Sequence, residues 1–189
     1  MTAFFDSVKD KMQLSPTSRE AFLSVMRNED YPKGHILVKP GTVCTSMFFV
    51  EKGLTRTFYY KDDKDVTDWF SPESTVAVSI VSFLNQQPDR RGIELLEDSN
   101  LWALDYKDLE MLCARHHEIE KFTRLLAAHG ILLIQERFDD LHFATAAERY
   151  KKLMDRQPTI LQRAPLGMIA SYLGITQETL SRIRSQHAF

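Results

Sequence analysis

Four polar side chains near the end of the sequence recur at spacings that place them on one face of a helix. They are Gln177, Glu178, Ser181 and Arg182, and Arg184 follows two residues later. Arginine can grip O6 and N7 of guanine, glutamine can pair with adenine, and glutamate can accept a hydrogen bond from cytosine. Ser181 and Arg184 are better suited to contacts with phosphates. These five residues therefore have the chemistry of a surface that reads DNA.

The segment that must position these side chains has the features of a helix-turn-helix. Pro165 suits the first turn of a helix, and small Ala170 allows a second helix to cross closely. Gly174 marks a sharp turn, and Thr176 is a good N-cap for a second helix. The buried side is formed by Ile169, Leu173, Ile175, Leu180 and Ile183. The pattern predicts a reading helix over 176–186, whereas the alternative interpretation is a pair of helices that only pack together.

The charge distribution supports a polyanionic partner at this end of the chain. Residues 144–189 contain seven basic and three acidic side chains, a net charge of +4, whereas the other 143 residues carry a net charge of −6. The whole chain has a formal net charge of −2. Arg149, Lys151 and Lys152 belong to the basic segment, and we expect them to contact phosphates.

Upstream, the sequence changes from helical to strand-like at about residue 31. The first thirty residues carry apolar side chains at helical spacing. The best strand candidates that follow cover residues 35–39, 46–51, 54–60, 66–70 and 101–104, while 76–84 fits a short helix. Turn residues such as Gly34, Gly41 and Gly53 separate them. Regularly spaced short strands predict a small barrel, roll or sandwich.

A long helix is predicted over residues 117–141, which contain no proline and a single glycine. Phe122, Leu126, His129 and Leu133 fall on one stripe, which is widened by Leu125, Leu132 and Ile134. A helix that is apolar on more than one side either packs two faces against its own domain or shares one face with a second subunit. We favour a homodimer, because a long helix leaving a β-domain has little else to pack against. A further helix is expected over 145–156.

Several classes of protein and site are disfavoured. Cys44 and Cys113 are the only cysteines and have no closely spaced partner, which excludes a disulfide framework or a CxxC-type metal cluster. His116 and His117 point about 100° apart on a helix, so we expect no metal site. A metal enzyme on a β-roll would need several ligands on its strands, yet only His35 lies there. No nucleophile–base pair, phosphate-binding glycine loop or paired carboxylate motif stands out, so we expect a protein that is not an enzyme. No apolar run approaches ~20 residues and no signal peptide is visible, so we expect it in the cytoplasm.

The sequence resembles the Crp/Fnr family of bacterial transcription regulators. The resemblance runs from Lys33-Gly34 and Pro40-Gly41, through the segment 47–54, to the segment 169–183. It implies an α+β fold: an N-terminal β-roll, or double-stranded β-helix, of the cyclic-nucleotide-binding type over residues 1–116, a dimerisation helix over 117–143 and a helix-turn-helix domain over 144–189. Glu178 and Arg182 match the family's base-contacting positions. Gln177 replaces the arginine usual in the family, which implies that the operator has a different DNA sequence. Because the sequence ends soon after the reading helix, it resembles wing-less members found in the Bacteroidetes.

The resemblance also identifies Glu73, Arg90 and Arg91 as candidate ligand-binding residues of the roll. Family members that bind cyclic nucleotides hold the phosphate with an arginine and the ribose hydroxyl with a glutamate. An alignment without gaps places Asp89 at the arginine position, where a carboxylate would repel phosphate, and only a one-residue slip would bring Arg90 there. Solvated loop charges are therefore the favoured interpretation of these arginines. We expect a roll that does not bind cyclic AMP or cyclic GMP, and no other cofactor is indicated.

Two functional hypotheses remain. The first is a dimeric regulator whose two reading helices lie ~34 Å apart on a roughly palindromic operator, with RNA polymerase as a further partner. The second is a small-molecule sensor that acts through a protein partner instead of DNA. Salt-sensitive DNA affinity that depends on Arg182 is expected only for the first.

Overall fold

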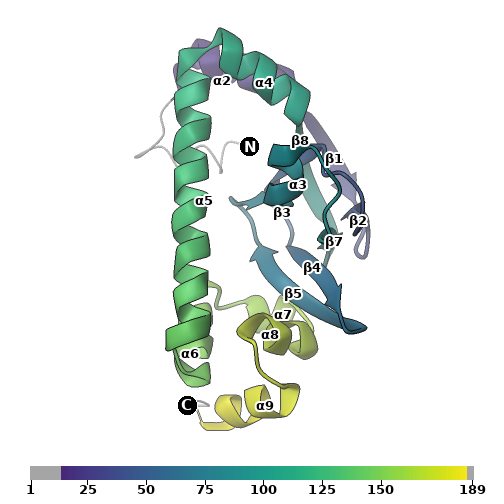
Figure 1. Ribbon diagram of the computed structural model, residues 1–189, viewed down its shortest axis with the longest axis vertical. Helices are drawn as coiled ribbons and strands as arrows, with labels where there is room; N and C mark the ends of the chain where they lie inside the picture. The colour runs from purple at the N-terminus through teal and green to yellow at the C-terminus, as the bar shows by residue number, and fades with distance from the viewer. Residues whose placement is uncertain (1–13, 187–189) are drawn as a thin grey trace.

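The computed structural model describes residues 14–186, which form a β-roll, a long helix and a group of C-terminal helices (Figure 1). Helix α5 (His117–Phe143) runs along one side of the molecule, the roll lies beside it, and helices α6–α9 lie at its far end. The α+β class and the roll confirm the prediction. Within the described residues, no helix has the length and apolar character needed to cross a membrane.

Eight strands form two antiparallel four-stranded sheets. The first has the order β1-β8-β3-β6 and the second the order β2-β7-β4-β5. Their bounds are β1 Arg27–Tyr31, β2 Ile36–Val38, β3 Ser46–Lys52, β4 Thr55–Lys61, β5 Lys64–Ser71, β6 Val76–Ala77, β7 Gly92–Leu95 and β8 Ser99–Asp105. Neighbouring strands such as β3 and β8 are far apart in the chain, so the roll is closed by long-range pairing.

Three local features of the roll differ from the prediction. Residues 27–31 form a strand instead of a helix end, because their backbone pairs with β8 from Arg27↔Ala103 to Tyr31↔Ser99. The segment 76–84 begins as strand β6, and only its second part enters helix α3 (Ile80–Asn85). Strand β7 was not predicted, although it pairs with both β2 and β4.

The interior of the roll is a packed apolar core. Phe22, on helix α2 (Pro16–Ser24), contacts Phe49 of β3 and Phe122 of α5 edge to face, at centroid distances of 6.0 and 5.7 Å. Helix α4 (Tyr106–Arg115) adds Leu109 and Leu112 to the same core. The beginning of α5 is thereby anchored to the roll, which fixes the direction of the rest of the helix.

The second half of α5 has an exposed apolar face. Its large exposed side chains are Ile131, Leu132, Ile134, Phe138, Leu141 and Phe143. Together with exposed Ala127, four of them recur at spacings of 4, 3, 4 and 3, which is the heptad spacing of a coiled-coil seam: Ala127, Ile131, Ile134, Phe138 and Leu141. This stripe differs from the predicted one, whose first member, Phe122, is buried in the core of the roll.

The C-terminal helices are α6 (Ala146–Arg156), α7 (Ile160–Arg163), α8 (Leu166–Leu173) and α9 (Gln177–Gln186). Helix α6 begins at a capping box, in which the Thr145 hydroxyl accepts from the Glu148 amide while the Glu148 carboxylate accepts from the Thr145 amide. These helices do not form a core by themselves. Leu54, Phe70 and Leu96 of the roll belong to the same buried apolar cluster as Ile160, Leu173 and the other C-terminal core residues.

Candidate DNA-binding site

Helices α8 and α9 meet at a sharp corner made by Gly174. This residue has a φ of +67°, in the left-handed region that favours glycine, and its amide donates to the carbonyl of Ser171. Its predecessors Ile169, Ala170 and Leu173 are buried. The Thr176 hydroxyl then accepts from the Thr179 amide at 3.2 Å and caps α9. The sequence pattern of a helix, a glycine corner and a capped second helix is therefore realised.

Helix α9 turns its apolar side inward and its polar side to solvent. Leu180 and Ile183 are buried, whereas the five predicted DNA-binding residues are all exposed: Gln177, Glu178, Ser181, Arg182 and Arg184. The Arg182 guanidinium donates to the Thr179 hydroxyl at 3.4 Å. The helix lies at the end of the molecule opposite α2 and α4 (Figure 1). Its polar face is therefore accessible to a large partner.

The three basic residues expected on phosphates are placed differently from one another. Arg149 donates to the carbonyls of Leu173 and Ala144, at 2.9 and 2.5 Å, and thus ties the ends of α8 and α5 together. Lys152 forms ion pairs with Glu136 and Asp140 of α5, at 2.6 and 2.8 Å. Lys151 is mostly exposed and, among residues 14–186, pairs only along its own helix, with Asp155. Of the three, Lys151 is the one most available to a phosphate.

The three candidate ligand-binding residues of the roll are not brought together. The Glu73 carboxylate accepts hydrogen bonds from the Gly53 amide and from Arg163 of α7. Arg90 is exposed, and its guanidinium lies over the ring of Tyr59. Arg91 is half-buried and pairs with the carboxylates of Asp68 and Asp89. Their positions do not define one shared pocket.

Two guanidinium groups of the roll that are buried or half-buried each contact two carboxylates. Arg91 pairs with Asp68 at 2.7 Å and with Asp89 at 3.2 Å. Asp89 also accepts from the Ser79 hydroxyl and from the Arg90 amide. Burial alone would raise the pKa of Asp89, but these hydrogen bonds and the Arg91 charge hold it below its ordinary value. The position that the alignment gave to a phosphate-binding arginine therefore holds an ionised carboxylate.

The second such group is Arg56, which the sequence analysis did not single out. Its side chain is only 4% exposed and pairs with Asp65 at 2.5 Å and with Glu94 at 2.7 Å. A signal was present in the sequence, because Arg56 stands between Leu54 and Phe58 on what would be one face of a strand. A charge in the middle of an apolar face needs a partner, and here the neighbouring strands β5 and β7 supply two.

The roll is similar to a known family of domains. Residues 28–116 match the family model described as the cyclic nucleotide-binding domain. The roll is therefore similar to the cyclic nucleotide-binding domain in sequence as well as in fold. No curated protein matches the sequence significantly. Among residues 14–186, no group of three or more histidine, cysteine or acidic side chains is placed to hold a metal ion.

Solved structures extend the likeness from this domain to most of the chain. FixK2 from Bradyrhizobium japonicum matches with a TM-score of 0.71 and 19% identity, over 86% of this chain and 84% of that one. The catabolite activator protein of Thermus thermophilus matches with a TM-score of 0.59 and 20% identity, over 98% and 86%. A protein from Eubacterium rectale, described as a regulator of the Crp/Fnr family, matches with a TM-score of 0.70 and 16% identity, over 97% and 86%. The chain has the fold of the Crp/Fnr regulators, as its sequence indicated.

Proposed function

We propose that this protein is a dimeric transcription regulator that reads DNA with helix α9. The observation that carries the proposal is the exposed polar face of α9, held by a buried α8–Gly174–α9 corner. Glu178 and Arg182 stand on that face, where they can contact base edges, while Ser181 and Arg184 can contact phosphates. The cyclic nucleotide-binding domain fold of the roll fits a sensor or scaffold that precedes such a reader.

The second copy of the chain is the natural occupant of the exposed face of α5. A seam with heptad spacing is buried efficiently by an identical seam in a parallel two-stranded coiled coil. The exposed fractions of Ile131, Ile134 and Phe138 are 66, 53 and 51%, so dimerisation would remove a large apolar surface from water. A two-fold dimer would present two α9 helices ~34 Å apart, and its operator would be an approximate inverted repeat.

The charges of the roll support a regulator that does not depend on cyclic AMP or cyclic GMP. Arg56 and Arg91 are each neutralised by two carboxylates, so each cluster is net negative and would repel a cyclic phosphodiester. We expect millimolar cyclic AMP to leave the melting temperature unchanged, since a ligand that binds the native state would raise it. As a regulator of this kind the protein would act in the cytoplasm beside RNA polymerase, without catalysing a reaction.

The decisive experiment is selection of fragmented genomic DNA of the source organism on purified full-length protein, followed by sequencing of the retained fragments. Three proteins are compared: wild type, Arg182→Ala, and Arg115→Ala as a control at an exposed arginine of α4. Wild type and Arg115→Ala should enrich the same inverted repeat, whereas Arg182→Ala should lose preference at one base pair of each half-site. Enrichment of no sequence by wild type, with or without cell extract, would favour a sensor that acts through a protein partner.

A further inference from the structure

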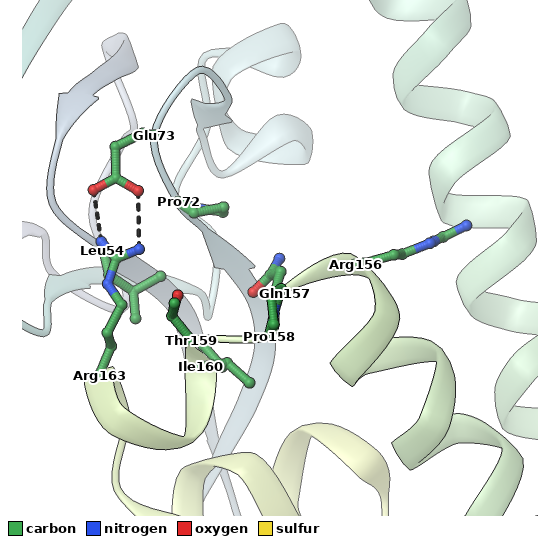
Figure 2. A pocket seen from close by; sticks show the side chains of 9 residues that line it. All are labelled: Leu54, Pro72, Glu73, Arg156, Gln157, Pro158, Thr159, Ile160 and Arg163. Carbon is green, nitrogen blue, oxygen red and sulfur yellow. Dashed lines mark hydrogen bonds and ion pairs between the residues drawn. The ribbon is translucent and has the colours of Figure 1, made fainter.

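The C-terminal domain is joined to the roll by an ion-pair cluster centred on Arg163 of α7. Its guanidinium donates to both oxygens of Glu73, at 2.9 and 2.7 Å, and to both oxygens of Glu97, at 2.6 and 3.3 Å. The two carboxylates lie 90 and 66 positions away in the sequence. Figure 2 shows the Glu73 carboxylate facing the Arg163 guanidinium, while Arg156 points away from them. We call Glu73, Glu97 and Arg163 the clamp.

The geometry of the clamp makes it more than a loose surface pair. The Arg163 side chain is only 20% exposed, and four N–H groups are directed at two carboxylates. Glu73 is itself fixed, because it accepts from the Gly53 amide at 2.9 Å. Burial alone would raise the pKa of Glu73, but Arg163 and this amide hold it below its ordinary value. Glu73 is therefore ionised at neutral pH, and it anchors the clamp to the backbone of the roll.

Apolar packing beside the clamp joins the same two parts of the chain. Leu54 of the roll and Ile160 of α7 line a cavity of about 160 Å³, together with Glu73 and Arg163 (Figure 2). Further along, the ring of Phe70 lies 5.2 Å from that of Tyr172 on α8. The interface has an apolar centre with the clamp at one side, so a shift of the C-terminal helices would have to break both.

A second attachment lies on α8 itself, the first helix of the DNA-binding pair. The Thr67 amide of β5 donates to the Ser171 hydroxyl at 3.0 Å. The Arg137 guanidinium of α5 lies 3.8 Å from the ring centroid of Tyr172 and donates to the Tyr172 carbonyl. The α8–α9 pair is thus held by the roll through α7 and α8 and by the long helix through Tyr172. Attachments to two different elements, the roll and α5, restrain the orientation of the pair more than one attachment would.

We propose that Arg163 is a positioning residue for DNA recognition, because the clamp it forms sets the separation of the two α9 helices in the dimer. This inference rests on the proposed function. Domains within one chain move relative to each other unless their interface holds them. With the clamp closed, the dimer accepts one half-site spacing. With the clamp open, only the apolar packing and the contacts of Ser171 and Tyr172 hold the α8–α9 pair, so its position varies more and neighbouring spacings become more acceptable.

The test uses full-length protein and inverted repeats built from the half-site that wild type selects, with the separation varied in steps of one base pair. The variants are Arg163→Gln, Arg163→Lys and the double variant Glu73→Gln/Glu97→Gln, with Arg115→Gln as the matched control. Wild type and the control should prefer one spacing by roughly tenfold or more over its neighbours. Arg163→Gln and the double variant should flatten that preference, and Arg163→Lys should restore part of it because it keeps the charge but not the fork.

Amide hydrogen exchange supplies a readout that needs no DNA. The Gly53 and Thr67 amides are bonded to acceptors that depend on the docked C-terminal domain, directly through Ser171 or through the clamped Glu73. Both amides should exchange several-fold faster in Arg163→Gln, while amides of β8 in the core of the roll should keep their protection and show that the variant is folded.

The outcomes separate the two proposals. An unchanged spacing profile and unchanged exchange at Gly53 and Thr67 in folded Arg163→Gln would overturn the clamp. A wild type that enriches no inverted repeat would overturn the proposed function, and faster exchange in the variant would then show the clamp as a structural joint without a role in DNA recognition.

Discussion

Arginine side chains are held in opposite ways in the roll and on the reading helix. Arg56 and Arg91 are buried or half-buried, and each is surrounded by two carboxylates. Arg182 and Arg184 are exposed on α9, and the hydrogen bond of Arg182 goes to a neutral hydroxyl. A guanidinium whose charge is already matched contributes to the fold, whereas one that faces water keeps its charge available to a polyanion. The difference supports α9 as the surface proposed to meet DNA.

The largest expected effect comes from removing a matched charge. Arg56→Met should destabilise the protein by about 2–4 kcal/mol, because Asp65 and Glu94 would face each other without their cation. The value is at the lower end for a buried pair because Asp65 is 41% exposed. Urea unfolding followed by circular dichroism measures it. Arg182→Met is the matched control and should stay within about 0.5 kcal/mol of wild type; equal losses in both would refute the contrast.

The second effect concerns DNA affinity. Arg182→Ala should weaken binding to the selected operator by about 1–3 kcal/mol and relax specificity at one base pair, if its guanidinium contacts a guanine. Fluorescence anisotropy on the operator and on single-base variants measures both. An equal loss of affinity for every DNA sequence would instead show that Arg182 contacts the phosphate backbone.

A smaller and uniform effect is expected at Lys151. Its side chain is 70% exposed and, within the part of the chain that the structure describes, pairs only with Asp155 of the same helix. Lys151→Gln should weaken binding to all DNA sequences evenly. It should also reduce the slope of log affinity against log salt concentration by about 1, because one phosphate contact is lost. Titrations at several salt concentrations measure the slope. Lys152→Gln is the comparison, since this lysine is held by two carboxylates of α5 and should change the slope less.

The smallest effect is a pH dependence at the junction of α5 and α6. Hydrogen bonds from Arg156 and Lys152 lower the pKa of Glu136 to about 2. A carboxyl group with a lowered folded-state pKa stabilises the fold above its unfolded pKa of about 4.3, and this contribution is lost as the pH falls toward 2. Melting temperatures between pH 6 and 2.5 should therefore fall less steeply in Glu136→Gln than in wild type. Identical slopes would show that the pairing contributes nothing to stability.

Helices α8 and α9, with the corner between them, were the part of the molecule that could be predicted best from the sequence. Gly174, Thr176 and the alternation of apolar and polar residues in 177–184 are local signals, since a corner, a cap and a helix face are each decided within a few residues. The helix over 145–156 was predictable for the same reason, through Thr145 and Glu148. Helical periodicity predicted the long helix, and the strand pattern left a barrel, roll or sandwich open until the resemblance to a known family favoured the roll.

Other features depended on residues that are far apart in the sequence. The polar segment 27–31 has no strand pattern of its own, yet it forms β1 because β8 offers a free edge. The apolar side of α5 could be predicted, but which stripe stays exposed was decided by the roll, which buries Phe122 and leaves Ile131 and Phe138 in solvent.

The sequence by itself determined helix α9, the composition of its exposed face and the change from strands to helices along the chain, because these depend on short-range periodicity and turn geometry. Only the tertiary structure decided what each charged side chain meets. Glu73 was a candidate ligand-binding residue in the sequence, and in the fold it meets Arg163, 90 positions away. Ion pairs of this kind depend on how the chain closes on itself, and no local pattern records which distant carboxylate a given guanidinium will reach.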